Sequence, residues 1–162
     1  SHEGGLLLFF GFIRHYKGLD LLIQAMSDER VKKLNLKLVV AGEFYEEEEK
    51  YSSLVNTLGL NEEILFFNEF IPDEQVPLFM SAADVLIQPY RHATQSGVTP
   101  LAYHFEKPIL VTNVGALPEM VLEDKSGIVT EPTAPSIAQG IWLYWKSDCL
   151  PSQMFQKDWH HC

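Results

Sequence analysis

Short apolar runs alternate with amphipathic stretches along nearly the whole chain. The apolar runs predict β-strands at residues 6–10, 36–42, 64–67, 85–88, 108–112 and 127–130. The stretches between them repeat apolar residues at the spacing of one helix face, and they predict helices at residues 18–26, 46–58, 72–80, 99–105 and 135–146, with a short turn at 118–121. Strands that are apolar throughout and separated by helices indicate a parallel sheet covered on both faces. We therefore predict an α/β fold in three α/β/α layers, a doubly wound, Rossmann-like parallel sheet of about six strands.

This fold predicts where a ligand would bind. In a doubly wound sheet, ligands lie beyond the carboxyl ends of the strands, near the point where the strand order reverses. The loops at those ends are residues 11–17, 42–43, 68–71, 89–97 and 112–115. A functional site is therefore expected among these loops.

Composition agrees with one globular domain. The chain has 162 residues, of which 46% are hydrophobic and 21% charged, a balance typical of a protein with a substantial core. The net charge of −10 argues against nucleic acid or an anionic membrane as the main partner, so a bound anion must be held by a local positive site. No apolar run approaches the length of a transmembrane span. Cys149 and Cys162 are expected to be reduced thiols in a cytoplasmic protein.

The same pattern predicts the boundaries of the domain. We expect residues 6–147 to form it, residues 1–5 to be a remnant of a tag, and residues 148–162 to be a C-terminal tail outside the core. Because no methionine opens the chain and a strand follows almost at once, we expect the sequence to be a piece of a longer protein.

The first loop carries two cations between a strand and a helix. Arg14 offers a fork of hydrogen-bond donors and Lys17 a compact charge, and together they could hold a diphosphate. The alternative is a solvated basic turn in which Lys17 and Gly18 only lead the chain into the helix. Arg91 and His92, after the fourth strand, either face the same cleft or lie on the surface.

The loop after the fourth predicted strand contains no carboxylate. Thr94, Gln95 and Ser96 bring side-chain donors, and Gly97 lets a ligand approach the backbone. Pro100 fits only in a first helical turn, so the helix is expected to start near Gly97, where its unpaired N–H groups suit a phosphate. A plain capping loop explains the threonine and serine equally well.

Three other residues stand at strand ends or helix starts. Phe70 and Ile71 either belong to the core, which is the interpretation that the residues alone favour, or pack against a nucleotide base. Glu119 is interpreted as a structural acid at the start of a helical turn. The histidines and cysteines lack the spacing of metal ligands, so no metal site is expected.

Taken in order, these elements resemble the C-terminal half of the group-one retaining glycosyltransferases, which have the two-domain GT-B architecture. The resemblance runs from about residue 6 to residue 146. Its elements are Gly11 with Lys17 and Gly18, residues 38–42, 66–71 and 83–89, Gly97, residues 107–112, Gly115 with Pro118 and Glu119, and Gly127. No single element is specific, but the ordered set has the spacing of the family.

The resemblance implies a site for a nucleotide-sugar donor. Lys17 and Gly97 match the family's diphosphate-binding lysine and glycine, and the residues implied to hold the diphosphate are Arg14, Lys17, Gln95, Ser96, Gly97 and Val98. The arginine that usually follows the glycine is Phe12 here, and Arg14 would take its place. Thr94 would lie near the donor sugar, and Phe70 and Ile71 near the nucleotide base.

The chain departs from the family pattern at two glutamates. The family usually has a pair separated by seven residues, the first near the donor sugar and the second on the nucleotide ribose. Counting back from Gly97, these places hold Thr94 and Ala102. Ala102 cannot bond a ribose through its side chain, so another group must do so or donor binding is altered. The hydrogen-bonding loop that begins at Thr94 looks like a replacement.

The implied reaction transfers a glycosyl group from a nucleotide sugar to a saccharide or lipid-linked acceptor in polysaccharide biosynthesis, with retention and without a metal or cofactor. The acceptor and any general base would come from a separate N-terminal domain, against which residues 148–162 would pack as a helix. No catalytic set is then complete in this chain, and the isolated domain is expected to be inactive. We expect a cytoplasmic location, peripheral to the membrane through the N-terminal domain. The alternatives are a nucleotide-sugar epimerase or phosphorylase of the same architecture, or a noncatalytic domain that binds a nucleotide or another protein.

Overall fold

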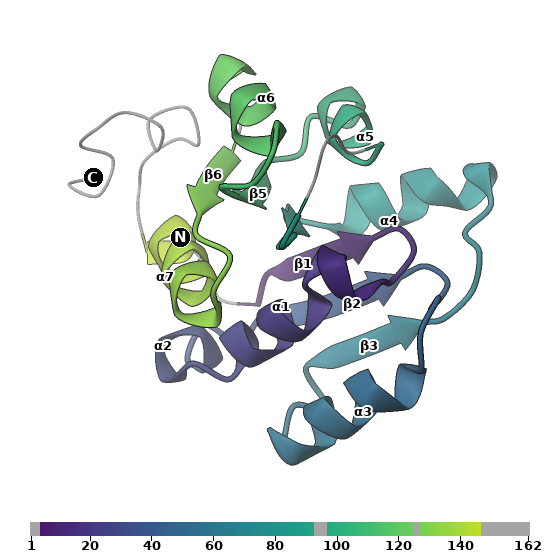
Figure 1. Ribbon diagram of the computed structural model, residues 1–162, viewed down its shortest axis with the longest axis vertical. Helices are drawn as coiled ribbons and strands as arrows, with labels where there is room; N and C mark the ends of the chain where they lie inside the picture. Colours follow the sequence, from purple (N-terminus) through teal and green to yellow (C-terminus); the bar gives the residue numbers. More distant parts are fainter. Residues whose placement is uncertain (1–3, 93–96, 125–126, 147–162) are drawn as a thin grey trace.

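The computed structural model describes residues 4–92, 97–124 and 127–146 (Figure 1). In this part of the chain, six parallel strands form one sheet in the order β3-β2-β1-β4-β5-β6. The strands are β1 (Leu6–Phe10), β2 (Lys37–Ala41), β3 (Ile64–Phe67), β4 (Val85–Gln88), β5 (Ile109–Thr112) and β6 (Gly127–Thr130). The order reverses between β1 and β4, because the chain winds outward from these two strands in opposite directions. This is the doubly wound, Rossmann-like sheet that the sequence predicts.

Helices cover both faces of the sheet. One face carries α1 (Leu19–Met26), α2 (Glu29–Lys32), α3 (Glu48–Thr57) and α7 (Ala134–Lys146). The other face carries α4 (Val76–Ala82), α5 (Thr99–His104) and α6 (Leu117–Asp124). Two single 3-10 turns, η1 (His15–Lys17) and η2 (Asp73–Gln75), lead into α1 and α4. The three predicted α/β/α layers are confirmed.

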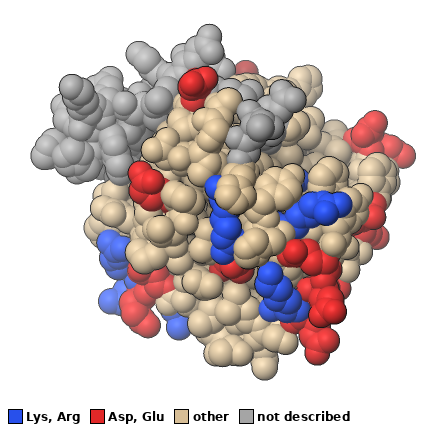
Figure 2. Space-filling model, viewed as in Figure 1, with Lys and Arg blue, Asp and Glu red and all other residues tan. Residues whose placement is uncertain are grey.

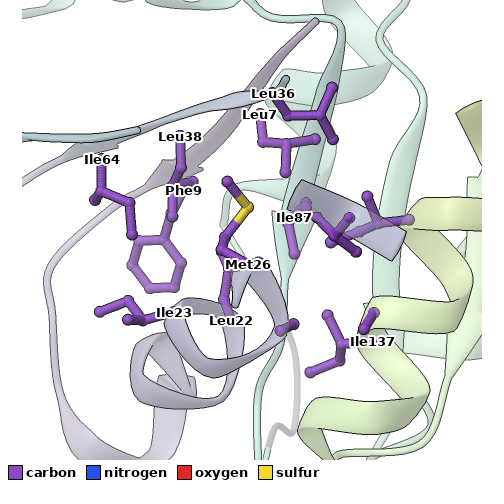
Figure 3. Packing of buried hydrophobic residues seen from close by; sticks show 14 of the residues in the cluster. Leu7, Phe9, Leu22, Ile23, Met26, Leu36, Leu38, Ile64, Ile87 and Ile137 are labelled. Carbon is purple, nitrogen blue, oxygen red and sulfur yellow. The ribbon is translucent and has the colours of Figure 1, made fainter. Parts of the chain in front are cut away.

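The core lies on both sides of β1. Leu7 and Phe9 point to the face that carries α1, where they pack with Leu22 and other apolar side chains of that helix (Figure 3). Leu8 points to the opposite face and packs with the cluster beneath α4 and α5. All three strand side chains are at most 1% exposed. Burial on both faces explains why the strand is apolar without alternation.

Three local elements differ from the prediction. The short turn expected at 118–121 is the helix α6, stabilised because Leu117 and Val121 are fully buried one helical turn apart. The helix expected at 72–80 is divided into η2 and α4, since Pro77 occupies the first turn of α4 and sets its start. The helix α2 was not predicted; Asp28 caps it by accepting a hydrogen bond from the backbone N–H of Arg30 at 2.9 Å.

Candidate functional site

The loops that follow β1 and β4 lie against one another at the point where the strand order reverses. The backbone N–H of Arg91 donates to the carbonyl of Tyr16 at 2.6 Å. Gly18, the N-cap of α1, has φ +71°, and a Cβ on it would lie 1.8 Å from the carbonyl oxygen of Pro89. Only glycine therefore permits this conformation and this close approach. The two loops form a single surface beyond the carboxyl ends of the central strands.

Lys17 is a buried cation in this surface. It ends η1 and is 6% exposed, and its ammonium lies 4.1 Å from the centre of the Phe12 ring. A Cβ on Gly11 would lie 3.4 Å from the Lys17 Nζ and 3.6 Å from Val98 Cγ2, so lysine and the start of α5 meet at this glycine. Burial, and then the charge of Arg14, lower the pKa of Lys17 from 10.5 to about 8. Among the described residues, no carboxylate lies within 4 Å of this ammonium.

Arg14 and Lys17 contact two different aromatic rings. The guanidinium carbon of Arg14 lies 4.8 Å from the centre of the Tyr45 ring. The rings of Tyr45 and Phe12 stack with their centres 5.1 Å apart and their planes at 2°. Phe12 therefore stands where the resemblance expects an arginine, and it contributes a cation–π contact to Lys17. The predicted basic pair lies beyond the carboxyl end of β1, but the stacked rings of Phe12 and Tyr45 lie between its two members.

A pocket of about 200 Å³ opens beside Gly11, at the carboxyl ends of β1 and β2. Its wall includes Phe12 and Tyr45, together with Phe70 and Ile71 from the loop after β3. Ile71 is 7% exposed, as the favoured core interpretation expects, whereas that interpretation is wrong for Phe70, which is 69% exposed. Within the described residues, the backbone N–H and C=O groups of Phe70 and Ile71 make no hydrogen bonds. The pocket thus offers an exposed ring and available backbone groups together.

The start of α5 is attached to the end of β4. The hydroxyl of Thr99 donates to the Gln88 Oε1 at 3.1 Å, and both residues are at most 1% exposed. Pro100 lies in the first turn, as predicted, and the helix begins two residues after Gly97. Gly97 is exposed, and apart from its two chain neighbours no described residue has an atom within 4 Å of the position that its Cβ would take. The sequence pattern gave Gln88 no role of its own, although a polar residue at the end of an apolar strand was a visible signal.

Three of the predicted donor-site residues, Thr94, Gln95 and Ser96, lie outside the described residues. Arg91 neither projects freely into the cleft nor lies as an unpaired surface residue. Its guanidinium forms a two-pronged ion pair with Asp20, at 2.8 and 2.6 Å. Asp20 has no signal of its own in the sequence, because it is one acid on an ordinary helix.

The amino-acid sequence matches the family described as "Glycosyl transferases group 1" over residues 1–157. The chain belongs to this family. It is 29% identical, over 137 residues, to an uncharacterized glycosyltransferase of Methanocaldococcus jannaschii, and the match covers 84% of this chain and 34% of that protein. The chain therefore spans about a third of the length of this curated relative. The resemblance that the ordered motifs indicate is confirmed.

Solved structures agree with this assignment at the level of the fold. The sucrose-phosphate synthase of Thermosynechococcus elongatus superposes with a TM-score of 0.79 at 21% identity, covering 97% of this chain and 40% of that one. The Anabaena protein HepE, solved in complex with UDP-glucose, superposes with a TM-score of 0.76 at 19% identity, covering 93% of this chain and 41% of that one. The six-stranded sheet described above is thus the sheet of GT-B glycosyltransferases.

The chain has alanine, not a carboxylate, at position 102, where the family resemblance leads us to expect a ribose-binding glutamate. Ala102 is fully buried in the cluster beneath α5, so its position faces the core. Glu119 lies exposed in the first turn of α6, in keeping with a structural acid there. Acidic side chains gather instead around the start of α3, whose first turn contains Glu48 and Glu49 (Figure 2). Position 102 therefore offers no side-chain hydrogen bond to a ligand.

Other features of the described chain offer less to a nucleotide. A larger groove of about 390 Å³ between α4 and strands β1–β3 is lined almost wholly by apolar side chains. Across the described residues, no three histidine, cysteine, aspartate or glutamate side chains are placed to hold a metal ion together. None of the described helices combines the length and the apolar character needed to span a membrane.

Proposed function

We propose that this chain is the donor-binding half of a retaining glycosyltransferase and binds a nucleotide sugar. The observation that supports this most strongly is the meeting of the Lys17 ammonium and Val98 at Gly11, beside the pocket that Phe70 lines. A cation, the start of α5 and an apolar pocket then occur side by side. The cation suits the diphosphate of a nucleotide, and the neighbouring apolar pocket suits its base.

The diphosphate lies between the first loop and the start of α5. Lys17 is a buried ammonium with no carboxylate nearby among the described residues, so an anion would relieve its desolvation. The side chain of Val98, at the start of α5, lies beside the same point, and the absence of a side chain at Gly11 leaves room for phosphate oxygens. Arg14 adds positive charge from its place on Tyr45. Gln95 and Ser96, between β4 and α5, complete this part of the proposal.

The nucleotide base occupies the pocket of about 200 Å³. Phe12 and Tyr45 already stack on one another and make cation–π contacts with Lys17 and Arg14, respectively. The ring of Phe70, in contrast, is exposed and available for stacking on a base. The backbone groups of Phe70 and Ile71, which make no hydrogen bond to another described residue, would bond the edge of the base.

In the proposed reaction, the glycosyl group leaves the donor and joins a saccharide or lipid-linked acceptor with retention at the anomeric carbon. Negative charge grows on the departing diphosphate as the glycosidic bond breaks, and Lys17 with the neighbouring amides would stabilise it. Thr94 would lie near the donor sugar. The acceptor site belongs to an N-terminal domain of the complete protein, so the isolated chain would bind nucleotide and transfer nothing. The complex of HepE with UDP-glucose supports the choice of a nucleotide sugar.

Calorimetric titration with UDP, GDP and ADP tests the proposal. We expect one of them to bind the isolated chain weakly, because the second half of the site is supplied elsewhere. Absence of binding by all three at millimolar concentration would refute a donor site.

A second candidate is a noncatalytic nucleotide-binding domain. It is favoured because a buried residue, Ala102, stands where the family pattern places the glutamate that binds ribose. The two candidates differ in turnover. The complete protein, supplied with the nucleotide sugar of the best-binding nucleotide, hydrolyses or transfers the sugar if it is an enzyme, and leaves it intact if it is not.

A further inference from the structure

One arginine attaches the loop after β4 to the loop that carries Lys17. The Arg91 Nη1 donates to Asp20 Oδ1 at 2.8 Å and to the carbonyl of His15 at 2.9 Å. Its Nη2 donates to Asp20 Oδ2 at 2.6 Å, and its backbone N–H donates to the carbonyl of Tyr16 at 2.6 Å. Four hydrogen bonds therefore converge on one residue, and none of them involves a nearest neighbour in sequence.

These bonds hold the chain on both sides of Lys17. His15 and Tyr16 directly precede the lysine, and Asp20 lies in the first turn of α1, three residues after it. The segment between is a tight turn, in which the backbone N–H of Lys17 donates to the carbonyl of Arg14 at 2.9 Å. A shift of Arg91 would therefore move the lysine with its turn.

The other end of the same connection is also fixed. Thr99, in the first turn of α5, donates to the side chain of Gln88 at the end of β4. Arg91, which follows Pro89 and Tyr90 after the end of β4, is thus bonded to the first loop and to α1. Thr99, at the start of α5, is bonded to the end of β4. This arrangement keeps both Val98 and Lys17 beside Gly11.

The chemistry of the pair suits orientation better than stabilisation. The side chains of Arg91 and Asp20 are 23% and 15% exposed, so the desolvation of both charges offsets much of their attraction. Only the planar fork of an arginine can bond both carboxylate oxygens and reach a carbonyl as well.

We propose that Arg91 and Asp20 are positioning residues that hold the Lys17 turn against the start of α5 and so set the affinity for the diphosphate of the donor. This inference rests on the proposed donor site. Neither residue needs to touch the nucleotide. Their loss would leave the base pocket intact and reduce the fraction of molecules whose cation and backbone amides are correctly placed.

The test compares a nucleoside diphosphate with its nucleoside. In Arg91→Lys and Asp20→Asn we expect the Kd for the best-binding diphosphate among UDP, GDP and ADP to rise about tenfold, as when only about a tenth of the molecules remain competent. The Kd for the matching nucleoside should not change. The double variant should be no worse than the single ones, because both remove the same contact. Arg30→Lys, in the exposed pair of Arg30 with Asp28, is the control and should change neither Kd.

Equal losses for diphosphate and nucleoside would mean that the pair only supports the fold, and no loss for either would also overturn the inference. Hydrogen exchange of the amides of residues 14–18 provides a measurement that needs no ligand. Arg91→Lys should accelerate exchange at these amides and leave the exchange rates of α3 unchanged. An unaltered rate at residues 14–18 would contradict the positioning role of Arg91. Failure of the wild-type chain to bind any of the three diphosphates would instead refute the donor site itself. The exchange data would still show whether Arg91 and Asp20 hold the turn that carries Lys17.

Discussion

Replacing Lys17 by methionine should make the ligand-free chain more stable and make it bind nucleotide more weakly. Methionine keeps an unbranched side chain that can pack on Phe12 and the surrounding rings, but it removes the charge. In the wild type, Lys17 as a residue is 6% exposed, and among the described residues no carboxylate lies within ion-pair distance of its ammonium. A site that is ready for an anion is therefore a source of instability when the anion is absent.

The size of the gain follows from the pKa of Lys17, which burial lowers from 10.5 to about 8. Since each unit in pKa corresponds to about 1.4 kcal/mol, the charged form is disfavoured in the folded state by at most about 3 kcal/mol at neutral pH. We expect Lys17→Met to recover about 1–3 kcal/mol in the free energy of unfolding. The folded-state pKa lies below the unfolded one, so the penalty is complete at pH 7 and disappears as the pH rises from about 8 to about 10.5.

Nucleotide binding should change in the opposite direction. A hydrogen bond to a charged group contributes about 1.5–3 kcal/mol, so loss of the ammonium should weaken a nucleoside diphosphate by about 2 kcal/mol, or about thirtyfold in Kd. The nucleoside, which lacks phosphate, should bind as before.

Urea denaturation at pH 7 and at pH 10, with calorimetry in parallel, measures both effects. The stability advantage of the variant should shrink at the higher pH. The control is Lys37→Met, which removes an exposed lysine at the start of β2 and should affect neither stability nor binding appreciably. A variant that is no more stable than the wild type and binds diphosphate equally well would refute both the buried charge and its role as a phosphate ligand.

Three further predictions concern the surroundings of the site. Gly18→Ala should lower the free energy of unfolding by more than about 2 kcal/mol, because its methyl group would collide with a carbonyl; Gly59→Ala, at φ +70° in open space, should cost only about 1 kcal/mol by urea denaturation. Phe70→Ala should leave the midpoint of thermal unfolding unchanged, since the ring is 69% exposed, but weaken nucleoside and nucleoside diphosphate alike by about 1–3 kcal/mol in calorimetry. Burial alone would raise the pKa of Asp20, but the hydrogen bonds and charge of Arg91 outweigh it and lower that pKa. The stability from Asp20 should therefore be present above the ordinary carboxyl pKa of about 4 and be lost as the pH falls through the lower folded-state value, so acid unfolding of Asp20→Asn should lack this component.

Much of the fold could be predicted because its signals are local. The strands β1, β3, β4 and β6 have the predicted bounds, since continuous apolar runs are the direct consequence of burial on both faces of a parallel sheet. The weaker predictions were elements whose signal is tertiary. The helix α6 forms because Leu117 and Val121 pack into the core, and four-residue α2 depends on its cap.

The candidate site was predictable only in part for the same reason. Lys17 and Phe70 lie beside a pocket at the expected strand ends, because the winding of the sheet brings every carboxyl end to one edge. Their surroundings carried no local signal. The preference for a core role at Phe70 failed because hydrophobicity alone does not distinguish a buried ring from one that borders a pocket.

The sequence by itself determined the alternation of strands and helices, the family and the loops in which the site lies. Only the tertiary structure decided that Lys17 is a buried cation against Phe12, and that Arg91 binds an aspartate 71 positions away. The reason is physical. Periodicity reports which face of an element is buried, and it repeats within a few residues along the chain. A contact between distant residues depends on the order in which the strands are wound, and this order places the loops after β1 and β4 against each other.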